Sequence, residues 1–320
     1  MWGHVEPKRA VLRLTPIFVA AVAASLVLVG CGLGAGRAPS AVQILITREF
    51  GASVLRQFDR PAVNGEETVM SLLLRNDAAV RTRFGGGFVQ SIDGVSGGQE
   101  AGQPVDWFYY VNGIQASKGA AATKVHPGDH IWWDHHDWSQ TEEVPAVVGS
   151  FPEPFLNGID GKRLPVRIDC AEVAGDACRT VAARFRELGV AAGIAGIGAS
   201  GEPQTLHVLV GRWGSVRGAE GARAIDGGPR SSGVYARFSP DGRSLTVLDA
   251  RGRAVRKLLA GTGLVAATRH AEDAPVWVVT GTDAAGVDLA ARAFETAVLH
   301  DHLAVALTAA GALPAPGAGR

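Results

Sequence analysis

Apolar and polar residues alternate along several short runs in the first part of the chain, and this period of two predicts strands. The clearest run is residues 106–111, where Trp107, Tyr109 and Val111 share one face and Phe108 and Tyr110 share the other. Similar runs cover residues 42–46, 88–92 and 130–136. A helical period occurs once here, over residues 68–75. Asn112 and Gly113 follow the clearest run and are the strongest short-range hairpin signal. The pattern predicts an α+β domain over residues 41–138.

The pattern changes beyond residue 165, where strand-like runs alternate with helical periods. Strands are predicted at residues 166–170, 205–210, 233–238, 244–248 and 276–280. The helical stripes are Cys178, Val181, Ala182, Phe185 and Leu188 after Asp176, which is the predicted cap, and Val287, Ala290, Ala291, Phe294 and Val298 after Asp283. Strands that alternate with helices predict an α/β sandwich domain with some antiparallel pairs, over residues 166–306.

Two further segments separate or follow the predicted domains. Residues 139–165 are rich in proline and predict an ordered linker, which Phe151, Phe155 and Leu156 attach to the fold. Residues 307–320 are rich in Ala, Gly and Pro and predict a flexible tail.

The N-terminal segment has the layout of an export signal. Lys8, Arg9 and Arg13 precede an apolar run over residues 14–29. At the end of this run a small residue, Gly30, precedes Cys31. This end resembles the lipobox of bacterial lipoproteins, which implies a signal peptide over residues 1–30, lipid on the Cys31 thiol and a lipid tether over residues 31–40. The alternative is a single spanning helix, although the run is slightly shorter than the roughly 20 residues that span a bilayer. We therefore expect a protein on the extracytoplasmic face of the cell membrane.

Charge and cysteine content narrow the class of protein. Without residues 1–30, which hold three basic residues and one acidic residue, 28 basic and 30 acidic residues remain of the 31 of each. A slightly acidic chain argues against nucleic acid as a partner. Cys170 and Cys178 are an even pair in a chain expected to be exported, so we predict a disulfide. Two buried free thiols are the alternative.

A family resemblance is carried by residues 88–95, 107–113, 119–120 and 127–132, with the phrases FVQSIDGV, WFYYVNG, GA and PGDHIW. These phrases resemble the C-terminal β domain of transcobalamin and intrinsic factor, which also exists in free-standing bacterial versions. The resemblance covers about residues 41–138 and implies a β-grasp-like N-terminal domain. In the vitamin carriers this domain covers one face of cobalamin together with a helical barrel, so a cobalamin-like ligand is implied, although this chain has no such barrel.

The aromatic strands supply the candidate binding residues. In the last strand of the first domain, one face carries polar groups around a single large aromatic, so we expect this face to be exposed. The candidates for ligand or partner binding are Trp107, Tyr109, His130, Trp132, Asp134, His136 and Trp138. The alternative is that these aromatics belong to the core or to a domain interface. His130, Asp134 and His136 are weak metal candidates, because side chains two residues apart on a strand point the same way.

Catalytic motifs are missing from the sequence. It contains no GxSxG elbow between a strand and a helix and no HExxH helix, so we expect no enzyme. Gly196, Gly198 and Gly201 match GxGxxG but lead into a predicted strand, which argues against a dinucleotide site. The first hypothesis is a lipid-anchored binding protein for a small cofactor or for a membrane transport partner. The second is a cell-surface scaffold for protein interactions, and the third is a metal-capturing lipoprotein.

Overall fold

The computed structural model describes residues 1–4, 42–59, 61–63, 65–77, 79–199 and 204–319. The predicted signal peptide, the tether and Cys31 lie outside the described residues, apart from the first four. Residues 34–320 form one compact unit, and the fold below is that of this unit. Among the described helices, none has the length and apolar character needed to cross a membrane. The unit mixes helices with several sheets, as the sequence predicted.

The first part of the chain is built on a six-stranded sheet with the order β2-β1-β9-β7-β6, and β8 pairs with β7. The strands are β1 Gln43–Arg48, β2 Ser53–Asp59, β6 Gly98–Glu100, β7 Gln103–Val111, β8 Ile114–Gln115 and β9 His130–Asp137. Strand β9 is central, since it runs parallel to β1 and antiparallel to β7. The strands predicted around residues 42–46, 106–111 and 130–136 are confirmed, whereas β2 was not foreseen.

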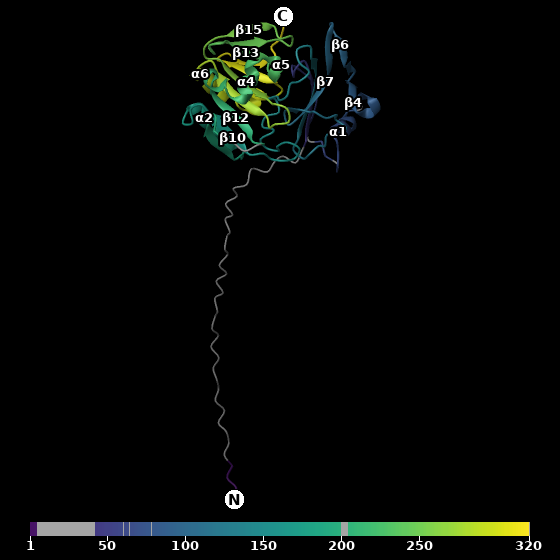
Figure 1. The fold of residues 1–320 in the computed structure, drawn as a ribbon. Helices are drawn as coiled ribbons and strands as arrows, with labels where there is room; N and C mark the ends of the chain where they lie inside the picture. The colour runs from purple at the N-terminus through teal and green to yellow at the C-terminus, as the bar shows by residue number, and fades with distance from the viewer. Residues whose placement is uncertain (5–41, 60, 64, 78, 200–203, 320) are drawn as a thin grey trace. The chain divides into compact units, whose positions relative to one another are not determined.

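One face of this sheet is covered by helix α1, Val69–Asn76, and by a small sheet of β3 Arg81–Arg83, β4 Phe88–Ile92 and β5 Val95–Ser96. Helix α1 begins where it does because Thr68 Oγ1 accepts a hydrogen bond from the Ser71 amide at 3.2 Å. The Thr68 amide in turn donates to Ser71 Oγ at 2.9 Å, which completes a capping box. Figure 1 shows α1, β4 and β7 together on one side of the unit.

The other face of the sheet packs against the second part of the chain. Tyr110 and Trp132 share a core with Trp213 and Tyr235, which come from more than 80 residues further along. The face of β9 that we expected to be exposed is therefore buried: His130, Trp132, Asp134 and His136 are 6%, 0%, 0% and 3% exposed. That prediction was wrong because a second layer covers the face, so both faces of β9 are interior.

The second part contains a seven-stranded sheet with the order β11-β10-β12-β17-β16-β18-β19. Its strands are β10 Val166–Cys170, β11 Ala192–Gly196, β12 Leu206–Arg212, β16 Gly263–Thr268, β17 Val276–Gly281, β18 Ala304–Thr308 and β19 Gly311–Ala315. Strands β11, β10, β12 and β17 are parallel, and β16, β18 and β19 join through antiparallel pairs. The predicted mixture of parallel and antiparallel pairing is therefore present.

Helices cover both faces of this second sheet. Helices α2 Asp176–Glu187 and α6 Ala284–Arg292 pack on one face, and α3 Trp213–Val216 and α4 Glu220–Asp226 pack on the face that meets the first part (Figure 1). The remaining elements are 3-10 turn η1 Phe84–Gly86, helices α5 Pro229–Ser232 and α7 Thr296–Leu299, and the small sheet of β13 Ala236–Phe238, β14 Leu245–Leu248 and β15 Ala254–Leu258.

The linker over residues 139–165 is ordered, and part of the predicted C-terminal tail belongs to strands β18 and β19. Phe151 and Phe155 are buried in the second core, where the Phe151 ring lies 4.7 Å from that of Phe294. At the other end, β19 pairs antiparallel with β18, and Ala315 is 1% exposed. The prediction of a flexible tail was wrong for residues 307–315, because backbone hydrogen bonds to β18 hold a segment whose composition alone indicates flexibility.

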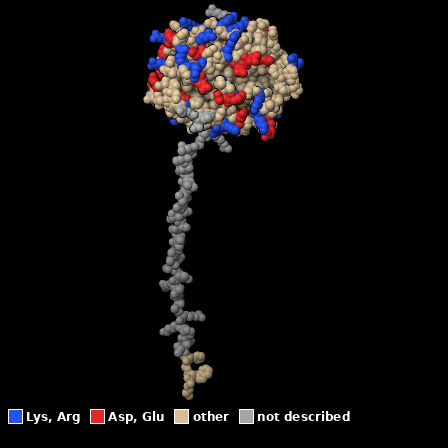
Figure 2. Space-filling model, in the orientation of Figure 1, with Lys and Arg blue, Asp and Glu red and all other residues tan. Residues whose placement is uncertain are grey.

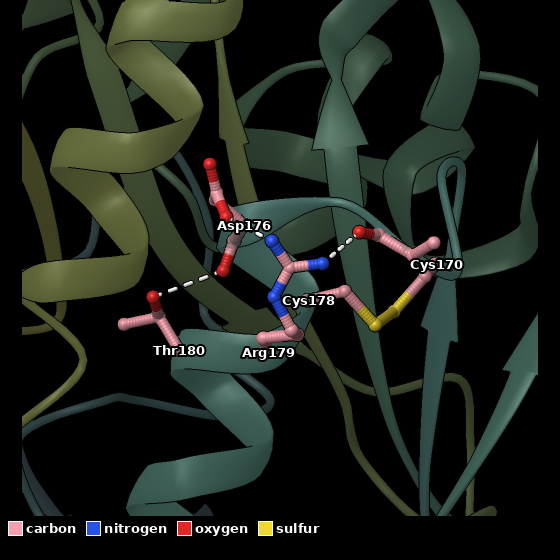
Figure 3. The surroundings of a disulfide bond; sticks show 6 residues. Cys170, Asp176, Cys178, Arg179 and Thr180 are labelled. Atoms are coloured by element: carbon pink, nitrogen blue, oxygen red, sulfur yellow. Dashed lines mark hydrogen bonds and ion pairs between the residues drawn. A yellow bond between two sulfur atoms is a disulfide. The ribbon is translucent and has the colours of Figure 1, made fainter.

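The predicted disulfide is present between Cys170 at the end of β10 and Cys178 in the first turn of α2 (Figure 3). Both cysteines are buried. Helix α2 begins at Asp176 with Gly175 as its N-cap, so the predicted capping role of Asp176 was wrong. Asp176 instead accepts a hydrogen bond from the Arg179 guanidinium. The disulfide closes a loop whose ends are 8 residues apart and ties strand β10 to helix α2.

We expect the C170A/C178A double variant to lose about 2.5 kcal/mol of unfolding free energy, because the unfolded chain without the disulfide has a higher conformational entropy. Urea titration of the wild type and the variant measures this difference. With reductant present throughout, the two proteins should have nearly the same midpoint. A variant as stable as the oxidised wild type would show that the bond does not restrain the unfolded state.

Candidate functional site

A cleft of about 520 Å³ lies where the ends of β1 and β9 meet the β14–β15 turn and the end of the chain. From the first part of the chain it is lined by Arg48, Phe50, His135, His136 and Asp137, among others, and from the second part by Arg251, Arg253, His302 and Pro314, among others. Both parts of the unit therefore contribute side chains to one site.

The β1–β2 turn forms part of the wall and is strained. Glu49, Phe50 and Gly51 have φ values of 57°, 62° and 85°, in the left-handed region. Gly51 is required, because a Cβ atom there would lie 2.0 Å from the Asp301 carbonyl oxygen. The amides of Phe50 and Gly51 donate to the Asp134 carboxylate at 3.1 and 3.0 Å. These two bonds hold the turn in a conformation that its sequence would otherwise avoid.

Asp134 is the centre of a buried network. Its carboxylate also accepts hydrogen bonds from Thr47 Oγ1 at 2.5 Å and pairs with His136 Nδ1 at 2.7 Å. Thr47 Oγ1 in turn accepts the Trp132 indole N–H at 2.7 Å. Burial alone would raise the pKa of the Asp134 carboxyl, but His136, Thr47 and the Gly51 amide outweigh it and the pKa lies below its usual value. Three of the predicted residues thus belong to one network.

His136 is held on three sides. Asp134 binds its Nδ1, and the rings of Phe50 and Phe108 stack on its two faces, each with centroids 4.4 Å from the imidazole. Within the described chain, Nε2 makes no hydrogen bond, and His136 lines the cleft. An imidazole oriented by a carboxylate is a preorganised group, which can bind a polar ligand atom through its second nitrogen.

The cations of the cleft differ in how firmly they are paired. Arg253 lies 2.7 Å from Asp249, and Arg48 lies 3.2 Å from Glu100. Arg251 is 4.0 Å from Asp137, at the outer limit of an ion pair, and its side chain is 43% exposed. Burial lowers the pKa of the nearby His302, which favours its neutral form. Arg251 is therefore the cleft cation most free to bind an anionic ligand.

The other predicted aromatic residues are structural. The Trp107 indole donates to the Val95 carbonyl at 3.0 Å, and the Tyr109 ring stacks on Trp133 with centroids 4.8 Å apart. Both lie in the core beneath α1, and Trp138 is half-buried at the end of β9. None of Trp107, Tyr109 and Trp138 is among the residues that line the cleft. Of the seven candidates, His136 alone is.

Of the three weak metal candidates, Asp134 and His136 are in contact, whereas His130 lies apart from them. His130 lies at the start of β9, six residues from His136, which is about 20 Å along a strand. Its Nδ1 is within 2.8 Å of Ser150 Oγ in the linker. A different group, Glu220, His270 and Asp273, places one ligand atom from each residue within 4.8 Å of the others, with all three side chains exposed. The sequence analysis missed this group, since its members are up to 53 residues apart.

Comparison with known proteins covers only part of the chain. A family described as a domain of unknown function, DUF4430, matches residues 66–137. A solved structure from Ruminococcus gnavus, for which metal binding is suggested, matches 31% of this chain and 97% of its own length, at 15% identity and a TM-score of 0.25. No curated protein matches. The segment that matches includes α1, β7 and β9.

Two buried titratable groups give a test of how the linker meets the sheet. Burial lowers the pKa of His130 to about 4 and raises that of Glu153, in the linker, to about 7. Protonation of His130 in the unfolded chain makes stability fall as pH drops from 6.5 toward 4. Ionisation of Glu153 in the unfolded chain makes stability fall as pH rises from 4.5 toward 7. The two slopes oppose each other.

In E153Q, His130 still contributes to the pH dependence of stability and residue 153 no longer does. We therefore expect the unfolding free energy of this variant to rise with pH between about 4.5 and 6.5. In H130Q, Glu153 still contributes, so the unfolding free energy should fall over the same pH range. The changes of unfolding free energy with pH should differ between the two variants by up to about 2.7 kcal/mol per pH unit. Urea titrations at several pH values measure both. Because other titrating groups are common to the two variants, parallel slopes would contradict the buried states of His130 and Glu153.

Proposed function

We propose that this protein is a lipid-anchored, extracytoplasmic binding protein that holds a small organic anion with an apolar portion in the cleft between its two parts. The observation that carries the proposal is the pairing, in one cleft, of an oriented imidazole at His136 with a loosely paired guanidinium at Arg251. We propose binding and no catalysis.

The size and lining of the cleft support this class of ligand. Its volume of about 520 Å³ is within the range of sites for small organic molecules. Phe50, Val105 and Pro314 supply apolar surface, and Arg251 supplies a planar donor suited to a carboxylate or phosphate. A ligand with an apolar portion and an anionic group would contact the apolar side chains and the guanidinium at the same time.

The position of the cleft supports the proposed anchoring. The first described strand, β1, begins at Gln43, and the cleft lies beyond Arg48 at its other end, roughly 17 to 20 Å away. A chain attached to a membrane before β1 would present the cleft at the far end of the sheet. The resemblance to the transcobalamin domain makes a corrinoid worth testing, although Trp107, Tyr109 and Trp132 are interior and not free to stack on it.

We expect native mass spectrometry of the protein purified from its own host to show a retained small molecule. A thermal-shift panel of hexanoate, benzoate, glutamate and cyanocobalamin then identifies the ligand class, with an anionic, partly apolar compound giving the largest shift. The R251Q variant should weaken binding about tenfold or more, since it loses a charge-assisted hydrogen bond.

The matched control is R243Q, which changes an exposed arginine of the same small sheet that is not part of the cleft. Its affinity should equal that of the wild type. Absence of any retained species, together with no thermal shift across the panel, would contradict the proposed cleft function, as would equal losses in R251Q and R243Q.

The anchoring has its own test. We expect C31A to abolish the mass added by lipid and to move the protein from the detergent phase to the aqueous phase in a phase-separation assay, because the thiol that would carry the lipid is gone. The C170A/C178A variant serves as a control for a general effect of cysteine loss. A wild-type protein without added lipid mass would rule out this mode of attachment.

A further inference from the structure

The tip of the β3–β4 hairpin exposes two aromatic rings. Phe84 is 85% exposed and Phe88 is 38% exposed, and their rings meet edge to face with centroids 6.2 Å apart. Phe84, Gly85 and Gly86 have positive φ values of 52°, 68° and 92°. A Cβ atom at Gly85 or Gly86 would have no neighbour within 4 Å, so the tip stands clear of the rest of the fold.

Three cations lie in or beside this hairpin. Arg81 and Arg83 of β3 are exposed, and among the described residues neither forms an ion pair. Lys118, also exposed and without an ion pair in the described chain, precedes Gly119, where a Cβ atom would lie 3.4 Å from the Gly87 carbonyl oxygen. Burial raises the pKa of Asp106, in β7 of the six-stranded sheet, and Arg83 is one of the cations near enough to oppose that rise. We call Arg81, Arg83, Phe84, Phe88 and Lys118 the aromatic–basic tip.

Single exposed apolar residues are normal on a protein surface, but this arrangement is more specific. Two rings in contact present apolar area to water at the end of a projecting loop, and three cations with no ion pair flank them. A partner that fits must offer a shallow apolar layer for the two rings and a high density of negative charge beside it for the cations. The interface of an anionic bilayer has this combination: aromatic rings partition into it, and each nearby Lys or Arg adds attraction to acidic headgroups.

We propose that the aromatic–basic tip binds the surface of an anionic lipid bilayer, with Phe84 and Phe88 in the headgroup region and Arg81, Arg83 and Lys118 against lipid phosphates. The proposal gains from the proposed function, because attachment at Cys31 would leave about a dozen residues before β1, a reach of at most roughly 40 Å. A fold held that close would meet the bilayer repeatedly, and the tip would set which side rests on it.

Vesicle co-flotation of residues 34–320, the compact unit without its anchor, tests the proposal directly. We expect the protein to float with vesicles of phosphatidylglycerol and phosphatidylcholine and not with phosphatidylcholine alone, and to be released by high salt. F84S/F88S should reduce the bound fraction at least fivefold. R81Q/R83Q should remove the preference for phosphatidylglycerol. Because these side chains are exposed, circular dichroism should show all variants folded.

L259S is the matched control, since Leu259 is 66% exposed on the second part of the unit and should not affect flotation. R251Q should float as the wild type does, which separates failure of the tip from failure of the cleft. Flotation that is absent in the wild type, or equally reduced in F84S/F88S and L259S, would overturn the proposal. A tip that captures a membrane protein by crosslinking, in a chain that does not float, would likewise overturn it in favour of a protein interface.

Discussion

Asp134 brings a carboxylate into the centre of the molecule, where an unpartnered charge would cost several kcal/mol. Four donors offset that cost: the amides of Phe50 and Gly51, the Thr47 hydroxyl and the His136 imidazole. Each of these bonds also fixes something else. The amides hold the left-handed β1–β2 turn, Thr47 joins β1 to the Trp132 indole, and His136 is turned toward the cleft. The geometry of the cleft wall therefore depends on a group that does not itself line the cleft.

The second constraint is that the central strand β9 of the first sheet is buried on both faces. Helix α1 covers one face, and the other forms a common core with α3, α4 and the small sheet β13-β14-β15. Trp132 is fully buried in that common core, and Gly149 of the linker approaches it so closely that a Cβ atom there would lie 2.8 Å from the ring. The two parts of the unit are thus packed as layers of one interior, which is why a cleft at their junction can have fixed walls.

Local signals in the sequence predicted local structure well. The Asp283 cap, the Asn112 hairpin and the alternation of β7 each depend on neighbours within a few residues, and all are present. The alternation also assigned the correct residues to each face of β9. It could not show that Trp213 and Tyr235 would cover the second face, since that depends on contacts far along the chain. Nor could it foresee the turn at Glu49 to Gly51, whose strain is held by a carboxylate 83 residues away. The arginines of the cleft were missed for the same reason, because the charges in the β14–β15 turn resemble those of any solvated turn until β9 is placed beside it.

Basic and acidic side chains are interspersed across the face that Figure 2 shows. The net charge of the protein therefore says little about which ligands this face would bind. With no large area of one sign on this face, long-range steering of a ligand toward it is weak, and recognition there must depend on individual groups that lack partners. Many of the arginines are committed to carboxylates at 2.7 to 3.3 Å, as Arg56, Arg217 and Arg269 are. Arg251 at the cleft and the cations of the aromatic–basic tip depart from that pattern. An arginine without a close carboxylate retains its full capacity to bind an external anion, and at these two places such cations lie near apolar side chains, which suits an anionic ligand with an apolar portion and an anionic lipid surface.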